Sequence, residues 1–332
     1  NYYIGGIVNK KSAFLAKLDS NYNILWTKNI SENLPQYSSR STVGNAIAID
    51  NRDNSVYICG TTEDMDDYRD RVNGEWNGFF NKYDSNGNKL WTKRLSSSRF
   101  DEVHDIEIDK NGYVYLTGVT YGNLHNQTNN GGDEYKYTWD YEKLSDAFVS
   151  KYDSNGNRLW TKLIGTDDAD SGESISVSDS GYIYITGTTS GNLHGHINAF
   201  KGDLTDTFVI KLDNNGNRLW TKLINESGGT HADSHSYLNI HSLNDRIYLT
   251  GFNDNNIICF LENYVLTIEG TSLNDNLQGT EDNENISGLL GDDIIDGGGG
   301  SDTAIYSSKY SNYSFSRSAN SINIADKRTG TT

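Results

Sequence analysis

The sequence predicts an all-β protein, and three repeating patterns carry that prediction. A hairpin motif ending in Trp recurs four times in residues 1–262, a short strand motif ending in Gly recurs five times, and residues 270–305 repeat with a period of nine. Pro occurs once, whereas Gly occurs 33 times and Tyr 22 times, as is typical of strands joined by tight turns. We therefore expect a partial or irregular β-propeller, with about five four-stranded blades in view, followed by a short parallel β-roll.

The hairpin motif predicts the third and fourth strands of each blade. Its Asp-x-Asn-Gly-Asn stretch is a strong turn signal, because Asn and Gly tolerate a positive φ. The Trp that follows predicts a large apolar anchor between blades. The four copies are FLAKLDSNYNILWTK (14–28), FFNKYDSNGNKLWTK (79–93), FVSKYDSNGNRLWTK (148–162) and FVIKLDNNGNRLWTK (208–222).

The second motif predicts another strand of each blade, before the hairpin. An alternating segment precedes it in four copies, so each full unit offers four strands. The first copy lacks its first strand and the fifth lacks its Trp strand. The copies of the motif are YIGG (3–6), YICG (57–60), YLTG (115–118), YITG (184–187) and YLTG (248–251), and the preceding segments are AIAID (46–50), DIEID (105–109), SISVS (174–178) and YLNIH (237–241).

These two motifs resemble the SBBP-type bacterial β-propeller repeat. The likeness rests on F-V-x-K-Y-D-x-N-G-N-x-L-W-T-K and on T-x-G-N-L-H, which opens inserts at residues 120–125 and 189–194. It covers most of residues 1–262. The resemblance implies a propeller fold, often in a surface or secreted setting, and it implies no settled activity.

Residues 270–305 divide without gaps into GTSLNDNLQ, GTEDNENIS, GLLGDDIID and GGGGSDTAI. Each unit opens with Gly, has an acid at its sixth position and has an aliphatic residue or Ala at its eighth. We expect one short strand and one turn per unit, with the eighth-position residues stacked into a narrow apolar spine. The segment holds eight acids and no Lys or Arg. It should resist compaction until a cation neutralises it, and carboxylate and carbonyl oxygens suit Ca²⁺.

The nonapeptides resemble the haemolysin-type repeat of RTX proteins, G-G-x-G-x-D-x-U-x. That family implies a parallel β-roll with Ca²⁺ between successive turns and type I secretion from a bacterium. The first two units depart from the pattern at the fourth position, where Leu273 and Asp282 replace Gly. The resemblance gives Asp293 and Asp302 as side-chain ligands, and Asp275 and Glu284 as lesser candidates. The turns and carbonyl oxygens would come from Gly288, Gly291, Gly297 and Gly300.

We divide the chain into propeller repeats (1–264), a calcium-binding roll (265–305) and a truncated β-rich flank (306–332), and we expect an internal fragment of a longer protein. The net charge of −17 argues against nucleic acid as a partner. No apolar run approaches the ~18 residues of a membrane helix, so we expect no membrane insertion. Cys59 and Cys259 lie in different repeats and resemble small strand residues, so a disulfide is not expected.

Other candidate sites are weaker. The Asp-x-Asn-Gly-Asn turns could be read as calcium loops, but the downstream acid that such loops need is missing, so we favour hairpins. His125, His194 and His196 lie in the inserts, and the pair two residues apart, His194 and His196, could bind a transition metal, but polar loop residues are the simpler interpretation. The same holds for the acidic insert that contains Glu63, Asp64, Asp66 and Asp67.

The function we expect is that of a secreted or cell-surface, non-catalytic protein. Its propeller would bind a glycan or a surface protein, and its roll would fold on Ca²⁺ after export. Two alternatives remain. One is a propeller enzyme of quinoprotein or lyase type, whose catalytic part could lie outside this fragment. The other is a structural surface-layer component.

Overall fold

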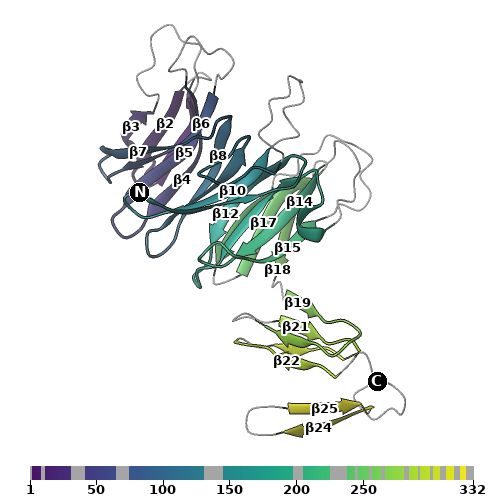
Figure 1. Ribbon diagram of the computed structural model, residues 1–332. Helices are drawn as coiled ribbons and strands as arrows, with labels where there is room; N and C mark the ends of the chain where they lie inside the picture. Colours follow the sequence, from purple (N-terminus) through teal and green to yellow (C-terminus); the bar gives the residue numbers. More distant parts are fainter. Residues whose placement is uncertain are drawn as a thin grey trace. The chain divides into compact units, whose positions relative to one another are not determined.

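The computed structural model of this chain is built almost wholly from β-strands (Figure 1). It divides into two compact units, Asn1–Glu262 and Asn263–Thr332. Among the described residues, no helix is long and apolar enough to cross a membrane. The structure describes residues 2–8, 12–30, 42–64, 75–130, 145–196, 205–224, 238–243, 246–253, 256–262, 266–279, 284–290, 292–299, 302–306, 312–317 and 322–326.

The first unit contains five antiparallel sheets in chain order. Three have four strands. The described residues give the first and last sheets three strands each, as expected from the copies that lack a strand. The first sheet is β1 (Tyr2–Val8), β2 (Ser12–Leu18) and β3 (Ile24–Asn29); the second is β4 (Thr42–Asp50), β5 (Ser55–Asp64), β6 (Glu75–Tyr83) and β7 (Lys89–Leu95); the third is β8 (Asp101–Ile108), β9 (Val114–Thr120), β10 (Asp146–Tyr152) and β11 (Arg158–Ile164); the fourth is β12 (Asp170–Val177), β13 (Ile183–Thr189), β14 (Asp206–Leu212) and β15 (Arg218–Ile224); the fifth is β16 (Leu238–Leu243), β17 (Arg246–Asn253) and β18 (Asn256–Glu262).

Successive sheets meet through their first strands. β4 contacts β8, β8 contacts β12, and β12 contacts β16. The Asn45 amide of β4, for example, donates to the Val103 carbonyl of β8 at 2.7 Å. Four-stranded antiparallel sheets that meet along their first strands form a partial β-propeller. The all-β propeller prediction is therefore confirmed.

The apolar core lies between the sheets. One cluster joins the first and second sheets, another the second and third, and another the third and fourth. Middle strands such as β9, β10 and β14 are buried along their whole length, because both faces of each sheet are covered. Trp26, Trp91 and Trp160 pack against these three clusters in turn, as expected of anchors between blades.

The Asp-x-Asn-Gly-Asn stretches form hairpin turns. Asp153 Oδ1 accepts hydrogen bonds from the backbone N–H groups of Asn155 (2.9 Å) and Asn157 (2.8 Å), and its Oδ2 accepts one from the Asn157 amide (2.8 Å). Gly156 has φ of +75°. The Asp84 and Asp213 turns use the same contacts. These carboxylates therefore hold their own turns, in agreement with the hairpin interpretation.

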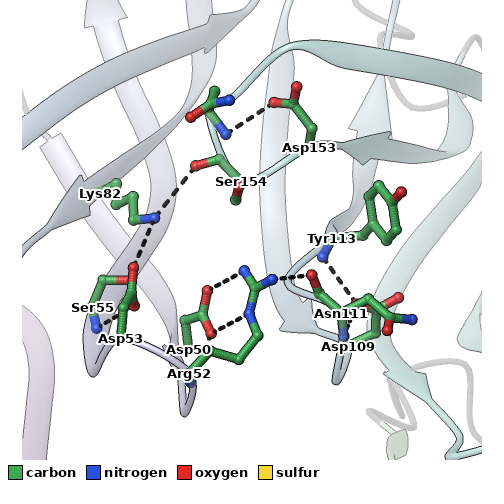
Figure 2. A network of polar contacts seen from close by, with 11 residues as sticks. Asp50, Arg52, Asp53, Ser55, Lys82, Asp109, Asn111, Tyr113, Asp153 and Ser154 are labelled. Carbon is green, nitrogen blue, oxygen red and sulfur yellow. Dashed lines mark hydrogen bonds and ion pairs between the residues drawn. The ribbon is translucent and has the colours of Figure 1, made fainter.

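The Lys of the first three hairpin motifs binds a carbonyl in the turn of the next sheet. Lys82 is almost fully buried, and its ammonium donates to the Ser154 carbonyl at 3.4 Å (Figure 2). Lys17 donates to the Ser85 carbonyl at 2.7 Å, and Lys151 to the Asn214 carbonyl at 3.3 Å. A repeated contact of this kind explains why the motif places a Lys inside an apolar strand: its stem lies along apolar surface and its charge reaches a turn.

Figure 2 also shows a second link between the second and third sheets. The Arg52 guanidinium donates two hydrogen bonds to the Asp50 carboxylate, from Nε to Oδ1 at 2.9 Å and from NH2 to Oδ2 at 2.8 Å. Its remaining nitrogen donates to the Asn111 carbonyl in the turn of the third sheet. The Asp50 carboxylate, only 1% exposed, thus orients the guanidinium toward the neighbouring sheet.

The second unit is a short parallel roll followed by an antiparallel hairpin. β19 (Leu266–Glu269), β21 (Glu284–Ser287) and β23 (Thr303–Ala304) form one parallel sheet, and β20 (Asn276–Gln278) and β22 (Ile294–Asp296) form the other. The hairpin pairs β24 (Tyr313–Arg317) with β25 (Ile322–Asp326). The expected parallel roll is confirmed as a fold.

Candidate functional site

The strand register of the roll determines which acids become neighbours. Leu277 pairs with Ile295 in one sheet and Ile286 with Ala304 in the other, so each full turn takes 18 residues. Consecutive nonapeptides therefore alternate between the two sheets. The eighth-position residues form two rows, one in each sheet, rather than the single spine expected. Ile286, between Ile268 and Ala304, is only 1% exposed.

Asp275 and Asp293 come next to each other because each lies two residues before a paired position. The Asp275 backbone N–H donates to Asp293 Oδ1 at 3.0 Å. The Asp275 carbonyl accepts from the Ile294 N–H at 2.8 Å. Asp275 Oδ2 in turn accepts from the backbone N–H (2.6 Å) and hydroxyl (3.0 Å) of Thr271. The two carboxylates therefore occupy adjacent coils of the roll.

The first-position glycines make room for these carboxylates. A Cβ on Gly288 would lie 2.0 Å from Asp293 Oδ2, and one on Gly297 would lie 2.3 Å from Asp302 Oδ2. Each acid therefore folds back onto the Gly that opens its own unit. The sequence assigned the turns to Gly288 and Gly297, but positive φ falls one residue later, at Leu289 (+66°) and Gly298 (+79°). Gly288 and Gly297 are required for close approach.

The donor set fits a hard cation. Carboxylate and carbonyl oxygens at a turn are ligands that Ca²⁺ prefers. Among the described residues, no group of three or more His, Cys, Asp or Glu is placed to hold a metal, so a site here would combine paired carboxylates with backbone oxygens. Gly291, Gly300 and the side chain of Glu284 lie outside the described residues.

The histidines of the inserts have structural partners. His125 Nδ1 lies 2.9 Å from the Thr161 hydroxyl, and His194 Nδ1 lies 2.8 Å from the Thr221 hydroxyl. Burial, with a nearby Arg, lowers the pKa of each to about 4, so both are neutral at physiological pH. His196 is exposed. The polar-loop interpretation fits these contacts better than a metal site. Asp66, Asp67 and the side chains of Glu63 and Asp64 lie outside the described residues.

The sequence did not predict a cluster of charged side chains on the first strands of the third and fourth sheets. β8 carries a β-bulge at His104, and the same bulge recurs at Asn45 in β4 and at Glu173 in β12. His104 Nδ1 donates to the Gly172 carbonyl at 2.9 Å and lies 3.5 Å from Glu173 Oε2. Its Nε2 lies 3.4 Å from Glu102 Oε2. Sequence alternation gave no signal, because a bulge interrupts it.

The charge of this cluster is fixed by its neighbours. Burial alone would lower the pKa of His104, but Glu102 and Glu173 outweigh it and raise that pKa to about 10. The imidazolium therefore bridges the third and fourth sheets as a cation between two carboxylates. Beside it, the half-buried Asp105 accepts hydrogen bonds from the Ser174 hydroxyl (2.8 Å) and the Ile175 N–H (2.9 Å) of the fourth sheet. These contacts join two blades.

Comparison with known proteins supports the propeller repeats. Residues 90–125 and 159–194 match the family described as SBBP, Beta-propeller repeat. Each match runs from the Trp strand of one sheet through the first two strands of the next and into its insert. Two curated proteins are similar to part of this chain. The regulatory protein FlaEY of Caulobacter vibrioides is 23% identical over 54% of this chain and 19% of that protein. An uncharacterized WD repeat-containing protein of Acanthamoeba polyphaga mimivirus is 26% identical over 46% of this chain and 12% of that protein.

The chain thus spans about a fifth or less of the length of these relatives. Among solved structures, it is similar to a protein of unknown function from Bacteroides caccae, with a TM-score of 0.41, 10% identity and coverage of 80% of this chain and 74% of that one. It is also similar to the apocarotenoid oxygenase of Synechocystis, with a TM-score of 0.37, 10% identity and coverage of 77% and 53%. Two segments of the partial propeller thus match the SBBP β-propeller repeat.

Proposed function

We propose that this chain belongs to a secreted or cell-surface, non-catalytic protein whose propeller presents binding loops and whose roll folds on Ca²⁺. The observation that carries the proposal is the 18-residue register of the roll, which brings Asp275 and Asp293 into adjacent coils. Two carboxylates on neighbouring coils repel each other unless a cation lies between them. The ligand of the propeller would be a glycan or a surface protein.

The mechanism is linkage between metal binding and folding. Without Ca²⁺ the acidic coils are held apart by their own charge, and a flexible chain is suited to export. Ca²⁺ at about 10⁻⁴–10⁻³ M, the range bound by extracellular modules, would neutralise the carboxylates. A free Ca²⁺ concentration 100 times the Kd would stabilise the folded roll by about 2.7 kcal/mol. Calcium would act as the folding signal outside the cell.

The test is a calcium titration of the whole chain followed by calorimetry and far-UV circular dichroism, with EDTA reversal. The variant Asp293→Asn with Asp302→Asn should weaken calcium binding to the roll at least tenfold. A matched control, Asp292→Asn with Asp179→Asn, removes the same charge from two exposed side chains. The proposal fails if the two double variants lose the same affinity, or if neither loses any.

A further inference from the structure

Two buried aspartates meet where the third and fourth sheets join. Asp146 opens β10 and Asp170 opens β12. Their exposed fractions are 0% and 1%. The Asp170 N–H donates to the carbonyl of Ser145, the residue just before Asp146, at 2.8 Å. The loop into β12 also covers Asp146, since a Cβ on Gly165 would lie 2.0 Å from Asp146 Oδ1. Both carboxylates are therefore enclosed by the same junction.

Each carboxylate uses one oxygen and leaves the other unsatisfied. Asp146 Oδ2 accepts from the Asn130 N–H at 2.9 Å. Asp170 Oδ2 accepts from the N–H (2.6 Å) and the hydroxyl (3.0 Å) of Thr166. Oδ1 of both aspartates is buried without a hydrogen-bond partner. A buried acceptor left in this state costs about 1–3 kcal/mol, and more if it is charged. Two such atoms at one junction indicate a missing partner.

The negative charge of Asp146 and Asp170 indicates the chemical nature of the missing partner. Burial raises the pKa of Asp146 to about 6 and that of Asp170 to about 7, and the charge of Asp146 adds to the shift of Asp170. Among the described residues, no Lys, Arg or His forms an ion pair with either carboxylate. The exposed Asp167 and Asp168 lie in the same loop and add further negative charge at its surface. The partner must be a cation or a proton.

We propose that Asp146 and Asp170 bind a divalent cation, Ca²⁺, through their Oδ1 atoms at the junction of the third and fourth sheets. Oxygen-only donors and two negative charges match a hard divalent ion. The remaining ligands would be backbone, hydroxyl or water oxygens, because the site supplies two carboxylates. The ion would join β10 to β12 and so fix one blade against the next. This site is separate from the roll and does not depend on calcium binding there.

The preceding junction of the same propeller supplies an internal comparison. Asp101 opens β8 and pairs with Thr120, as Asp170 opens β12 and pairs with Thr189. Opposite Asp101, however, the position of Asp146 is taken by Asn77 of β6. That junction therefore has one carboxylate and one amide, so it carries one negative charge where the junction of the third and fourth sheets carries two. The chain itself shows that Asn is compatible with the fold at this position.

The experiment uses the full chain with Asp293→Asn and Asp302→Asn, so that the roll does not contribute. Isothermal titration with Ca²⁺ should show about one equivalent bound at the junction, and calorimetry in Ca²⁺ should show a higher Tm than in EDTA. Asp146→Asn, which copies the Asn77 arrangement, should remove that equivalent and the Ca²⁺-dependent rise in Tm while the chain still folds. Asn77→Asp should create a further binding equivalent at the preceding junction.

Three results would overturn this site. One is a roll-deficient chain that binds no Ca²⁺, and another is an unchanged equivalent in Asp146→Asn. The third is a Tm that responds to pH between 5 and 8 but not to Ca²⁺, which would mean that the two carboxylates share a proton instead. Loss of binding only in the roll variants would contradict the junction site and leave the proposed function standing. Calcium binding at the junction but not in the roll would support the junction site and contradict the proposed function.

Discussion

The indole ring of Trp91 lies over Gly156 of the next sheet. Gly156 has φ of +75°, and a Cβ there would lie 3.3 Å from Trp91 Cη2 and 2.6 Å from Lys93 Cε. The same relationship joins Trp26 to Gly87 and Trp160 to Gly216. Glycine is thus needed at this position for two reasons, the left-handed turn conformation and the close approach of the neighbouring Trp.

Gly156→Ala should therefore destabilise the propeller more than the turn conformation alone requires. We expect a loss of about 2–4 kcal/mol from the left-handed backbone and from overpacking against Trp91. Gly181→Ala is the matched control, because Gly181 has φ of +86° but a Cβ there would meet no atom within 4 Å, and it should lose about 1 kcal/mol. Urea unfolding of both variants measures the difference. Equal losses would contradict the role assigned to Trp91.

His104 should remain protonated to about pH 10, because Glu102 and Glu173 outweigh the cost of burying its charge. Its folded pKa is raised above the unfolded value, so its contribution to stability is fully present below pH ~6.5 and is lost as the pH rises through about 10. Titration of the imidazole by NMR checks this. Glu173→Gln should lower that pKa, and an unchanged midpoint would show that Glu173 does not hold the charge.

His125 and His194 should affect the pH dependence of stability in the opposite direction to His104. Burial and a nearby Arg lower their folded pKa values to about 4, so the stability that each contributes is present above pH ~6.5 and is lost as the pH falls toward 4. His125→Gln should flatten the fall in unfolding free energy between pH 7 and pH 4.5, as measured by urea unfolding. Gln127→Asn, at an exposed residue that does not titrate in the same insert as His125, is the control and should leave that slope unchanged.

Cys59 should be chemically inert in the folded protein. Its side chain is 0% exposed, and burial raises its pKa well above the ordinary value, so the thiolate is scarce. In a Cys259→Ser background, thiol-specific labelling of Cys59 should proceed only as fast as the chain unfolds. Labelling that is as fast in buffer as in urea would show that the core around Cys59 opens freely.

The repeats of the sequence determined much of the fold. The Asp-x-Asn-Gly-Asn turns could be predicted from local chemistry, since Asp153 bonds residues only two and four positions away. The spacing of the Trp residues likewise predicted the blades, and the period of nine predicted the coils of the roll. These features are local or strictly periodic, and a periodic pattern of apolar residues constrains strands directly.

What only the tertiary structure decided lies between the repeats. The bulge that turns His104 toward Gly172, the space that Gly288 leaves for Asp293, and the meeting of Asp146 with Asp170 are not visible in any single motif. The propeller contacts depend on which strand of one sheet lies against the next, and the 18-residue register of the roll depends on how its coils close. Side chains of one type also differ between sites: the Asn88 amide lowers the pKa of Asp84 within its turn, whereas burial raises the pKa of Asp146 to about 6, because the neighbours that packing supplies determine the cost of the charge.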